Sequence, residues 1–95
     1  MVENIELDKD SKIKLKHMAI DKDTTLNKWM EKGAQYVLDN NIDIEETEVG
    51  DYTTYTMEIP IELKEGIRAY TKEKEVRLRD FWATVSNIII ENGGL

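Results

Sequence analysis

The sequence predicts a mainly α-helical protein with one two-stranded antiparallel ribbon, in the order β-α-α-linker-β-α-α. Three observations predict this fold: an internal repeat offset by 52 positions, an alternating apolar pattern at the start of each copy, and a helical apolar period in the rest. With 95 residues, the chain can form one small domain. A copy of about 40 residues is too small to bury a stable core alone, so the two copies are expected to combine.

The repeat relates two stretches of the chain, residues 1–40 and 53–95, which align without a gap. Few aligned residues are identical, but the apolar positions coincide, as Trp29 does with Phe81. Residues 41–52 hold five acidic residues and no basic one. They therefore account for most of the net charge of the chain, which is -7. The acidity therefore belongs to a connector, and the two nearly neutral copies are expected to form one compact domain together.

Each copy begins with apolar residues that alternate with polar ones, which is typical of a strand with one buried face. The apolar members are Ile5 and Leu7 in the first copy, and Met57 and Ile59 in the second. A lone strand has no hydrogen-bonding partner, so the two strands are expected to pair antiparallel beneath the helices.

Two helices are expected in each copy. The first helices begin near Asp8, whose side chain can cap backbone amides, and near Pro60, whose fixed φ suits a first turn. The second helices begin after Thr25 and Arg77 and end at asparagine or glycine residues. The residues expected on the buried faces are Leu15, Met18 and Ala19; Leu26, Trp29, Met30, Gly33 and Val37; Leu63, Ile67, Tyr70 and Thr71; and Leu78, Phe81, Trp82, Val85 and Ile89.

Two stretches carry a resemblance to a known family. Residues 18–30 (MAIDKDTTLNKWM) and 59–65 (IPIELKE) resemble the turn between the helices and the strand exit of ribbon-helix-helix DNA-binding proteins of the Arc, MetJ and CopG type. The resemblance implies a tandem, single-chain pseudo-dimer that binds operator DNA as a transcriptional repressor, such as a plasmid, viral or antitoxin-like regulator. Family members commonly have glycine at the turn, where this chain has Asp23 and Glu75; aspartate tolerates a left-handed conformation better than glutamate does.

The outward side chains of such a ribbon can meet base edges in the major groove of double-stranded DNA. Asparagine can pair with adenine, threonine can hydrogen-bond or touch a thymine methyl group, and glutamate can accept from the cytosine amino group. The residues expected to read bases are Val2, Asn4, Glu6, Thr54, Thr56 and Glu58. The alternative is that the two glutamates are solvated strand residues without a role in binding.

The amino ends of the second helices are expected to clamp phosphates, because first-turn amides and the helix dipole attract anions. The residues expected at these ends are Thr25, Leu26 and Lys28, and Arg77, Leu78 and Arg79. Alternatively, Arg77 and Arg79 form ordinary surface pairs with Glu75 and Asp80.

The composition argues against several other functions. The chain has no cysteine and one histidine, which predicts no metal site, no cofactor and a reducing, cytoplasmic environment. No nucleophile, base and orienting group occur together, so no enzymatic activity is expected. The longest apolar run is far shorter than the about 20 residues that span a membrane, so no membrane partner is expected.

Protein partners are also suggested by the sequence. One ribbon makes a small contact with DNA, so cooperative self-association on an operator is expected. Ile13 and Ile20 form an extra apolar stripe on the first helix, which either another protein or connector residues Ile42, Ile44 and Val49 would cover, and the connector is favoured. The acidic residues leave open a different class of function, a protein-binding module such as an antitoxin or a viral inhibitor of host defence.

Overall fold

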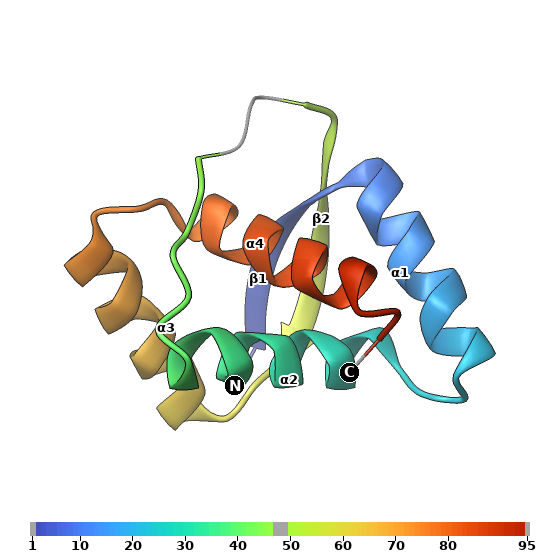
Figure 1. Cartoon of the computed structure of the whole chain (residues 1–95), viewed down its shortest axis with the longest axis horizontal. Helices are drawn as coiled ribbons and strands as arrows, with labels where there is room; N and C mark the ends of the chain where they lie inside the picture. The colour runs from blue at the N-terminus through green and yellow to red at the C-terminus, as the bar shows by residue number, and fades with distance from the viewer. Residues whose placement is uncertain (1, 47–49, 95) are drawn as a thin grey trace.

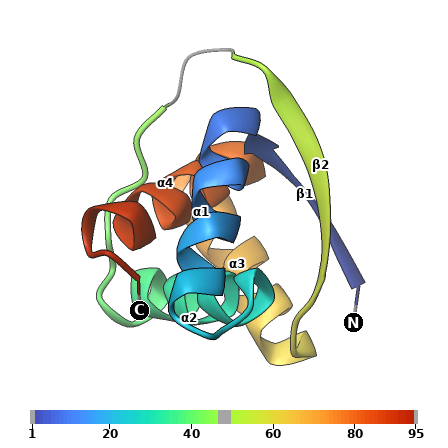
Figure 2. The same ribbon diagram turned by 90° about the vertical axis from the view of Figure 1, so that its right-hand side faces the viewer.

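The computed structural model describes residues 2–46 and 50–94, which contain two strands and four helices. Their order is β1 (Val2–Asp8), α1 (Lys9–Asp21), α2 (Leu26–Asp39), β2 (Tyr52–Glu58), α3 (Ile61–Lys74) and α4 (Leu78–Glu91). The strands form one antiparallel two-stranded sheet, and the helices gather on one side of it (Figure 1, Figure 2). The protein is therefore mainly helical with one antiparallel ribbon, as the sequence predicts.

The register of the ribbon matches the offset of the sequence repeat. Asn4 lies directly opposite Thr56, the residue 52 positions later. The helices α2 and α4 also begin and end 52 residues apart. The second strand begins at Tyr52, the last residue of the expected connector, so the ribbon is longer than the alternating pattern predicts.

One face of the ribbon forms part of the hydrophobic core. Ile5, Leu7 and Met57 are at most 3% exposed, as the alternating pattern predicts. Ile59 is also buried, although it follows the end of β2. Figure 2 shows the ribbon edge-on, with the helices on one side and the opposite face open.

The helices begin at the residues that the local signals indicate. Asp8 caps α1 by accepting a hydrogen bond from the Ser11 amide at 3.0 Å. Thr25 caps α2 in the same way by accepting from the Lys28 amide at 3.2 Å. Pro60 immediately precedes α3, and both α2 and α4 are followed by an asparagine. The predicted boundaries are confirmed at these positions.

The two second helices, α2 and α4, pack against each other in the centre of the molecule. Gly33 of α2 permits the close approach, since a Cβ atom there would lie 2.7 Å from Cγ1 of Val85. The rings of Phe81 and Trp82 meet edge to face with their centres 5.2 Å apart. Every residue expected on a buried helix face is buried, apart from Met18 and Leu78, which are partly buried.

Both turns that join consecutive helices, α1 to α2 and α3 to α4, place a residue other than glycine in the left-handed conformation. Asp23, between α1 and α2, has a φ of 55°, and so has Glu75, between α3 and α4. This conformation costs a residue with a Cβ atom about 1–2 kcal/mol. Aspartate offsets part of that cost by local hydrogen bonding, whereas glutamate is less suited to it. The turn before α4 is therefore the more strained of the two.

We expect Glu75→Gly to raise the free energy of unfolding by about 0.5–1 kcal/mol, because relief of strain outweighs the greater freedom of glycine in the unfolded chain. The matched control is Glu65→Gly, on the exposed face of α3, which should lower it by about 1 kcal/mol. Urea denaturation measures both changes. Destabilisation by Glu75→Gly would show that this turn is not strained.

Candidate nucleic-acid interface

The solvent-facing side of the ribbon brings together all six residues that the sequence predicts to read bases. Each is exposed. In the ladder they form three facing pairs: Val2 with Glu58, Asn4 with Thr56, and Glu6 with Thr54. They therefore form one continuous surface, here called the ribbon face.

The centre of the ribbon face is polar and uncharged. The Thr56 hydroxyl donates a hydrogen bond to Oδ1 of Asn4 at 2.7 Å. Because this bond uses the amide oxygen, the NH₂ group of Asn4 remains to donate to a partner. The cross-strand pair therefore offers a hydrogen-bond donor of the kind that can meet an acceptor on a base edge.

Carboxylates lie on both sides of this central pair. Glu6 and Glu58 are exposed, and neither strand contains a lysine or an arginine. The backbone of Glu58 is held by Asn27 in the first turn of α2: its amide donates to Oδ1 of Asn27, and its carbonyl accepts from Nδ2, both at 3.0 Å. The first turn of α2 is thereby fixed beside the end of β2.

The amino end of α2 is the first of the two expected phosphate clamps. Its Thr25 and Lys28 side chains are exposed, whereas Leu26 is buried and can contribute only its backbone. The Thr25 hydroxyl already accepts the Lys28 amide proton. This end therefore offers the Lys28 ammonium group and the first two amides of the helix to an anion.

The amino end of α4, the second expected clamp, has an arginine bound to a buried carboxylate. Nε of Arg77 donates to Asp80 at 2.9 Å, and Nη2 makes a second bond at 3.2 Å. Asp80 is only 1% exposed. The hydrogen bond to Asp80 raises the pKa of Arg77, and the charge of Glu46 in the connector raises it further. The alternative prediction, a surface pair of Arg77 with Asp80, is confirmed, although its carboxylate is buried.

Arg79, in the same turn, contacts the ribbon. Its Nη1 lies 3.8 Å from Oε2 of Glu6, and its guanidinium carbon lies 4.7 Å from the centre of the Tyr52 ring. The alternative that paired Arg79 with Glu75 or Asp80 is therefore wrong about the partner. No local pattern indicates this contact, because Arg79 and Glu6 are distant in the sequence and meet only when β1 packs beside α4.

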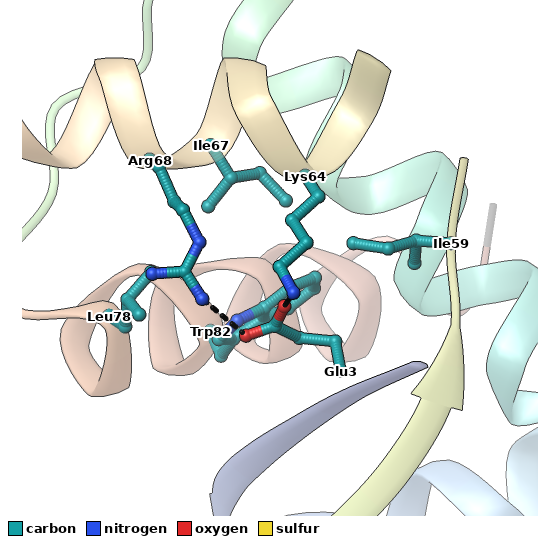
Figure 3. Close-up of a pocket in the computed structure, with 7 residues that line it drawn as sticks. All are labelled: Glu3, Ile59, Lys64, Ile67, Arg68, Leu78 and Trp82. Carbon is teal, nitrogen blue, oxygen red and sulfur yellow. Dashed lines mark hydrogen bonds and ion pairs between the residues drawn. The ribbon is translucent and has the colours of Figure 1, made fainter. Parts of the chain in front are cut away.

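A buried acid that the sequence analysis did not single out is Glu3, on the inner side of β1. It is 9% exposed and forms ion pairs with Lys64 at 3.2 Å and Arg68 at 3.5 Å, both from α3 (Figure 3). The surrounding pocket, walled by apolar residues that include Trp82, is too narrow to admit a water molecule. Glu3 therefore ties β1 to α3. Glu3 stands two residues before Ile5, and this spacing, which puts both side chains on the same face of the strand, is the one feature of the sequence that indicates its burial.

Residues 41–46 of the acidic connector lie against α3 and the start of α4 (Figure 1). The Tyr70 hydroxyl donates a hydrogen bond to the carbonyl of Ile42. Nζ of Lys74 lies 4.0 Å from the carboxylate of Asp43. Ile42 and Ile44 pack partly buried against the core. This part of the connector is thus anchored to α3.

The extra apolar stripe of α1 remains uncovered. Ile13 is 50% exposed and Ile20 is 74% exposed. The prediction that the connector covers this stripe is wrong for Ile42 and Ile44, because Tyr70 holds that part of the chain on the opposite side of the molecule. The third residue named for this role, Val49, lies outside the described residues.

Comparison with known proteins finds no match to this chain among family models, curated proteins or solved structures. Within residues 2–46 and 50–94, no group of three histidine, cysteine or acidic side chains could hold a metal ion. None of the helices in these ranges is long and apolar enough to cross a membrane. A function must therefore be inferred from the ribbon face and the helix ends.

The contact of Tyr70 with the connector should make stability depend on alkaline pH. Burial raises the pKa of Tyr70 above its usual 10.0, and Asp43 and Glu73 raise it further. The unfolded chain therefore loses this proton before the folded protein does. The contribution to stability is complete below the unfolded-state pKa and is lost as the pH rises through the folded-state pKa.

We expect the free energy of unfolding of the unmodified protein to fall more steeply above about pH 10 than that of Tyr70→Phe, which has no phenolic proton to lose. Urea denaturation at a series of alkaline pH values measures both slopes. Tyr36→Phe, which alters an exposed tyrosine, is the control and should keep the unmodified slope. Equal slopes for all three proteins would contradict the role of Tyr70.

Proposed function

We propose that this chain is a tandem ribbon-helix-helix protein, folded as a pseudo-dimer, that inserts its ribbon face into the major groove of double-stranded DNA. The agreement between repeat and register supports the pseudo-dimer. In a two-fold symmetric antiparallel ribbon, the strands pair at equivalent residues where they cross the axis. Asn4 and Thr56 are equivalent in the repeat and lie opposite each other.

Reciprocal contacts between the two copies support the same proposal. Lys64 of the second copy pairs with Glu3 of the first at 3.2 Å. Their equivalents in the repeat are Lys12 and Tyr55, and Nζ of Lys12 lies 5.6 Å from the centre of the Tyr55 ring. Each strand is thus held by the first helix of the other copy, which is the arrangement expected of two intertwined halves.

The single observation that carries the DNA-binding proposal is the two-sided ribbon, with one face packed on helices and the other exposed. A two-stranded ribbon fits the major groove, which is about 12 Å wide. Asn4 and Thr56 would then meet base edges. The first turns of α2 and α4 lie beside the ribbon, because Asn27 contacts Glu58 and Arg79 contacts Glu6. These turns would face the phosphates on the two sides of the groove.

Sequence-specific binding of this kind serves transcriptional repression when the operator overlaps a promoter. The facing side chains differ between the two strands, so one chain would read a site without two-fold symmetry. Because a single ribbon contacts few base pairs, several chains would bind one operator cooperatively. The exposed Ile13 and Ile20 stripe is one surface through which such chains, or another protein, would associate.

A second candidate function is favoured by the charge of the ribbon face. Its only charged side chains are those of Glu6 and Glu58, and the chain as a whole has a net charge of -7. A negative surface attracts basic partners and repels phosphates. The same fold would then act as a protein-binding module, such as an antitoxin or a viral anti-defence inhibitor.

Selection from a pool of random duplexes separates the two functions. A DNA-binding repressor should enrich one sequence, and its affinity for that duplex should fall steeply as salt rises from about 50 to about 200 mM. A protein-binding module should enrich no sequence and should instead retain a basic protein from a cell extract. Absence of enrichment at low salt would therefore reject the DNA-binding proposal.

We expect Asn4→Ala to weaken binding to the selected duplex by about 1–3 kcal/mol and to relax the preference at one base pair. Its affinity for unrelated duplexes should change little, because these are bound through phosphates. Asn87→Ala, at an exposed position of α4 away from the ribbon, should leave both affinities unchanged. Fluorescence anisotropy measures each. An equal loss on selected and unrelated duplexes would mean that Asn4 does not read a base.

A further inference from the structure

Arg79 and Glu6 form an ion pair between the first turn of α4 and the ribbon face. Nη1 of Arg79 lies 3.8 Å from Oε2 of Glu6, which is longer than a hydrogen bond. The Glu6 side chain is 57% exposed and the Arg79 side chain is 23% exposed. The pair therefore lies at the edge of the surface that would contact DNA, and solvent reaches both partners.

The guanidinium group is held in place by more than this pair. It stacks on the ring of Tyr52, and its Nε makes no hydrogen bond within the described part of the chain. The residues that line the adjacent groove, of about 240 Å³, include Asn4, Glu6, Leu78, Arg79 and Trp82. Arg79 is thus positioned at an open groove beside the ribbon. Its Nε is buried, but its Nη1, 3.8 Å from Glu6, makes no hydrogen bond to that carboxylate.

The equivalent place in the first copy lacks such a pair. Asn27 stands 52 positions before Arg79 and binds the backbone of Glu58 rather than its carboxylate. Among the described residues, the Glu58 side chain has no ion pair. Glu6 and Glu58 are therefore equivalent exposed carboxylates on one surface, of which only Glu6 holds an arginine.

We propose that Glu6 is an intramolecular competitor of DNA phosphates for Arg79. This inference rests on the proposed function and concerns its regulation. Carboxylates and phosphates bind the same guanidinium donors. In the free protein Glu6 holds Arg79; on DNA, Arg79 exchanges the carboxylate for a phosphate oxygen at the side of the groove. The ion pair thereby lowers the affinity of the protein for DNA of any sequence. The amino end of α4 binds a phosphate through Arg79 only after this exchange.

The test compares Glu6→Gln with Glu58→Gln, because each removes one negative charge from the ribbon face and relieves general repulsion to the same extent. The probe is a duplex of arbitrary sequence, since Glu6 could also read a base in a selected site. We expect Glu6→Gln to bind this duplex about threefold to fivefold more tightly than Glu58→Gln. This is the gain in affinity expected when binding no longer has to break one partly exposed ion pair. In an Arg79→Gln background the difference should disappear.

Two results would overturn the inference while leaving DNA binding intact. One is equal tightening by Glu6→Gln and Glu58→Gln, and the other is a difference that persists in the Arg79→Gln background. Either would mean that Glu6 acts only through its charge at a distance. If none of the proteins binds any duplex, even at low salt, the proposed function fails and the inference fails with it. Urea denaturation of each variant verifies that all of them fold.

Discussion

The pairing of β1 with β2 is the interaction on which the rest of the structure depends. Within the described residues, neither strand has any other partner, so each relies on the other half of the chain for its backbone hydrogen bonds. The same pairing lines up Ile5, Leu7 and Met57 as one buried surface beneath the helices. Loss of the ladder would therefore remove both the ribbon face and one wall of the core.

Ion pairs join the ribbon to the helices α3 and α4. Glu3 is neutralised from α3 by Lys64 and Arg68, and Glu6 is held from α4 by Arg79. These three cations are therefore already engaged with carboxylates of the same chain, whereas Lys12 of α1 donates to the carbonyl of Thr54 instead. Binding of DNA as proposed would therefore require these cations to exchange their carboxylates for phosphates.

Local signals were sufficient to predict most of the fold from the sequence. Asp8, Thr25 and Pro60 mark helix starts through capping or a fixed φ, which act within one turn and need no tertiary context. The alternation of apolar residues likewise identified the buried face of each strand. The six residues of the ribbon face could be predicted for the same reason, because the side chains of a strand alternate between two faces.

What the sequence did not predict depends on contacts between distant residues. The burial of Glu3 is possible only because α3 supplies two cations, and the path of the connector depends on the hydroxyl of Tyr70. The partner of Arg79 follows from the packing of α4 beside β1. Local periodicity contains none of this information, which is why the prediction that Ile42 and Ile44 cover the stripe of Ile13 and Ile20 is wrong.

The most direct test of the central claim is an NMR titration of the isotopically labelled protein with a duplex recovered by selection. Binding through the ribbon face predicts that the largest shifts of backbone amides occur in β1 and β2, around Asn4 and Thr56, and in the first turns of α2 and α4. Amides in the carboxyl-terminal half of α4, around the exposed Asn87, should hardly move. Shifts confined to α1 and α3, with an unchanged ribbon, would contradict the claim.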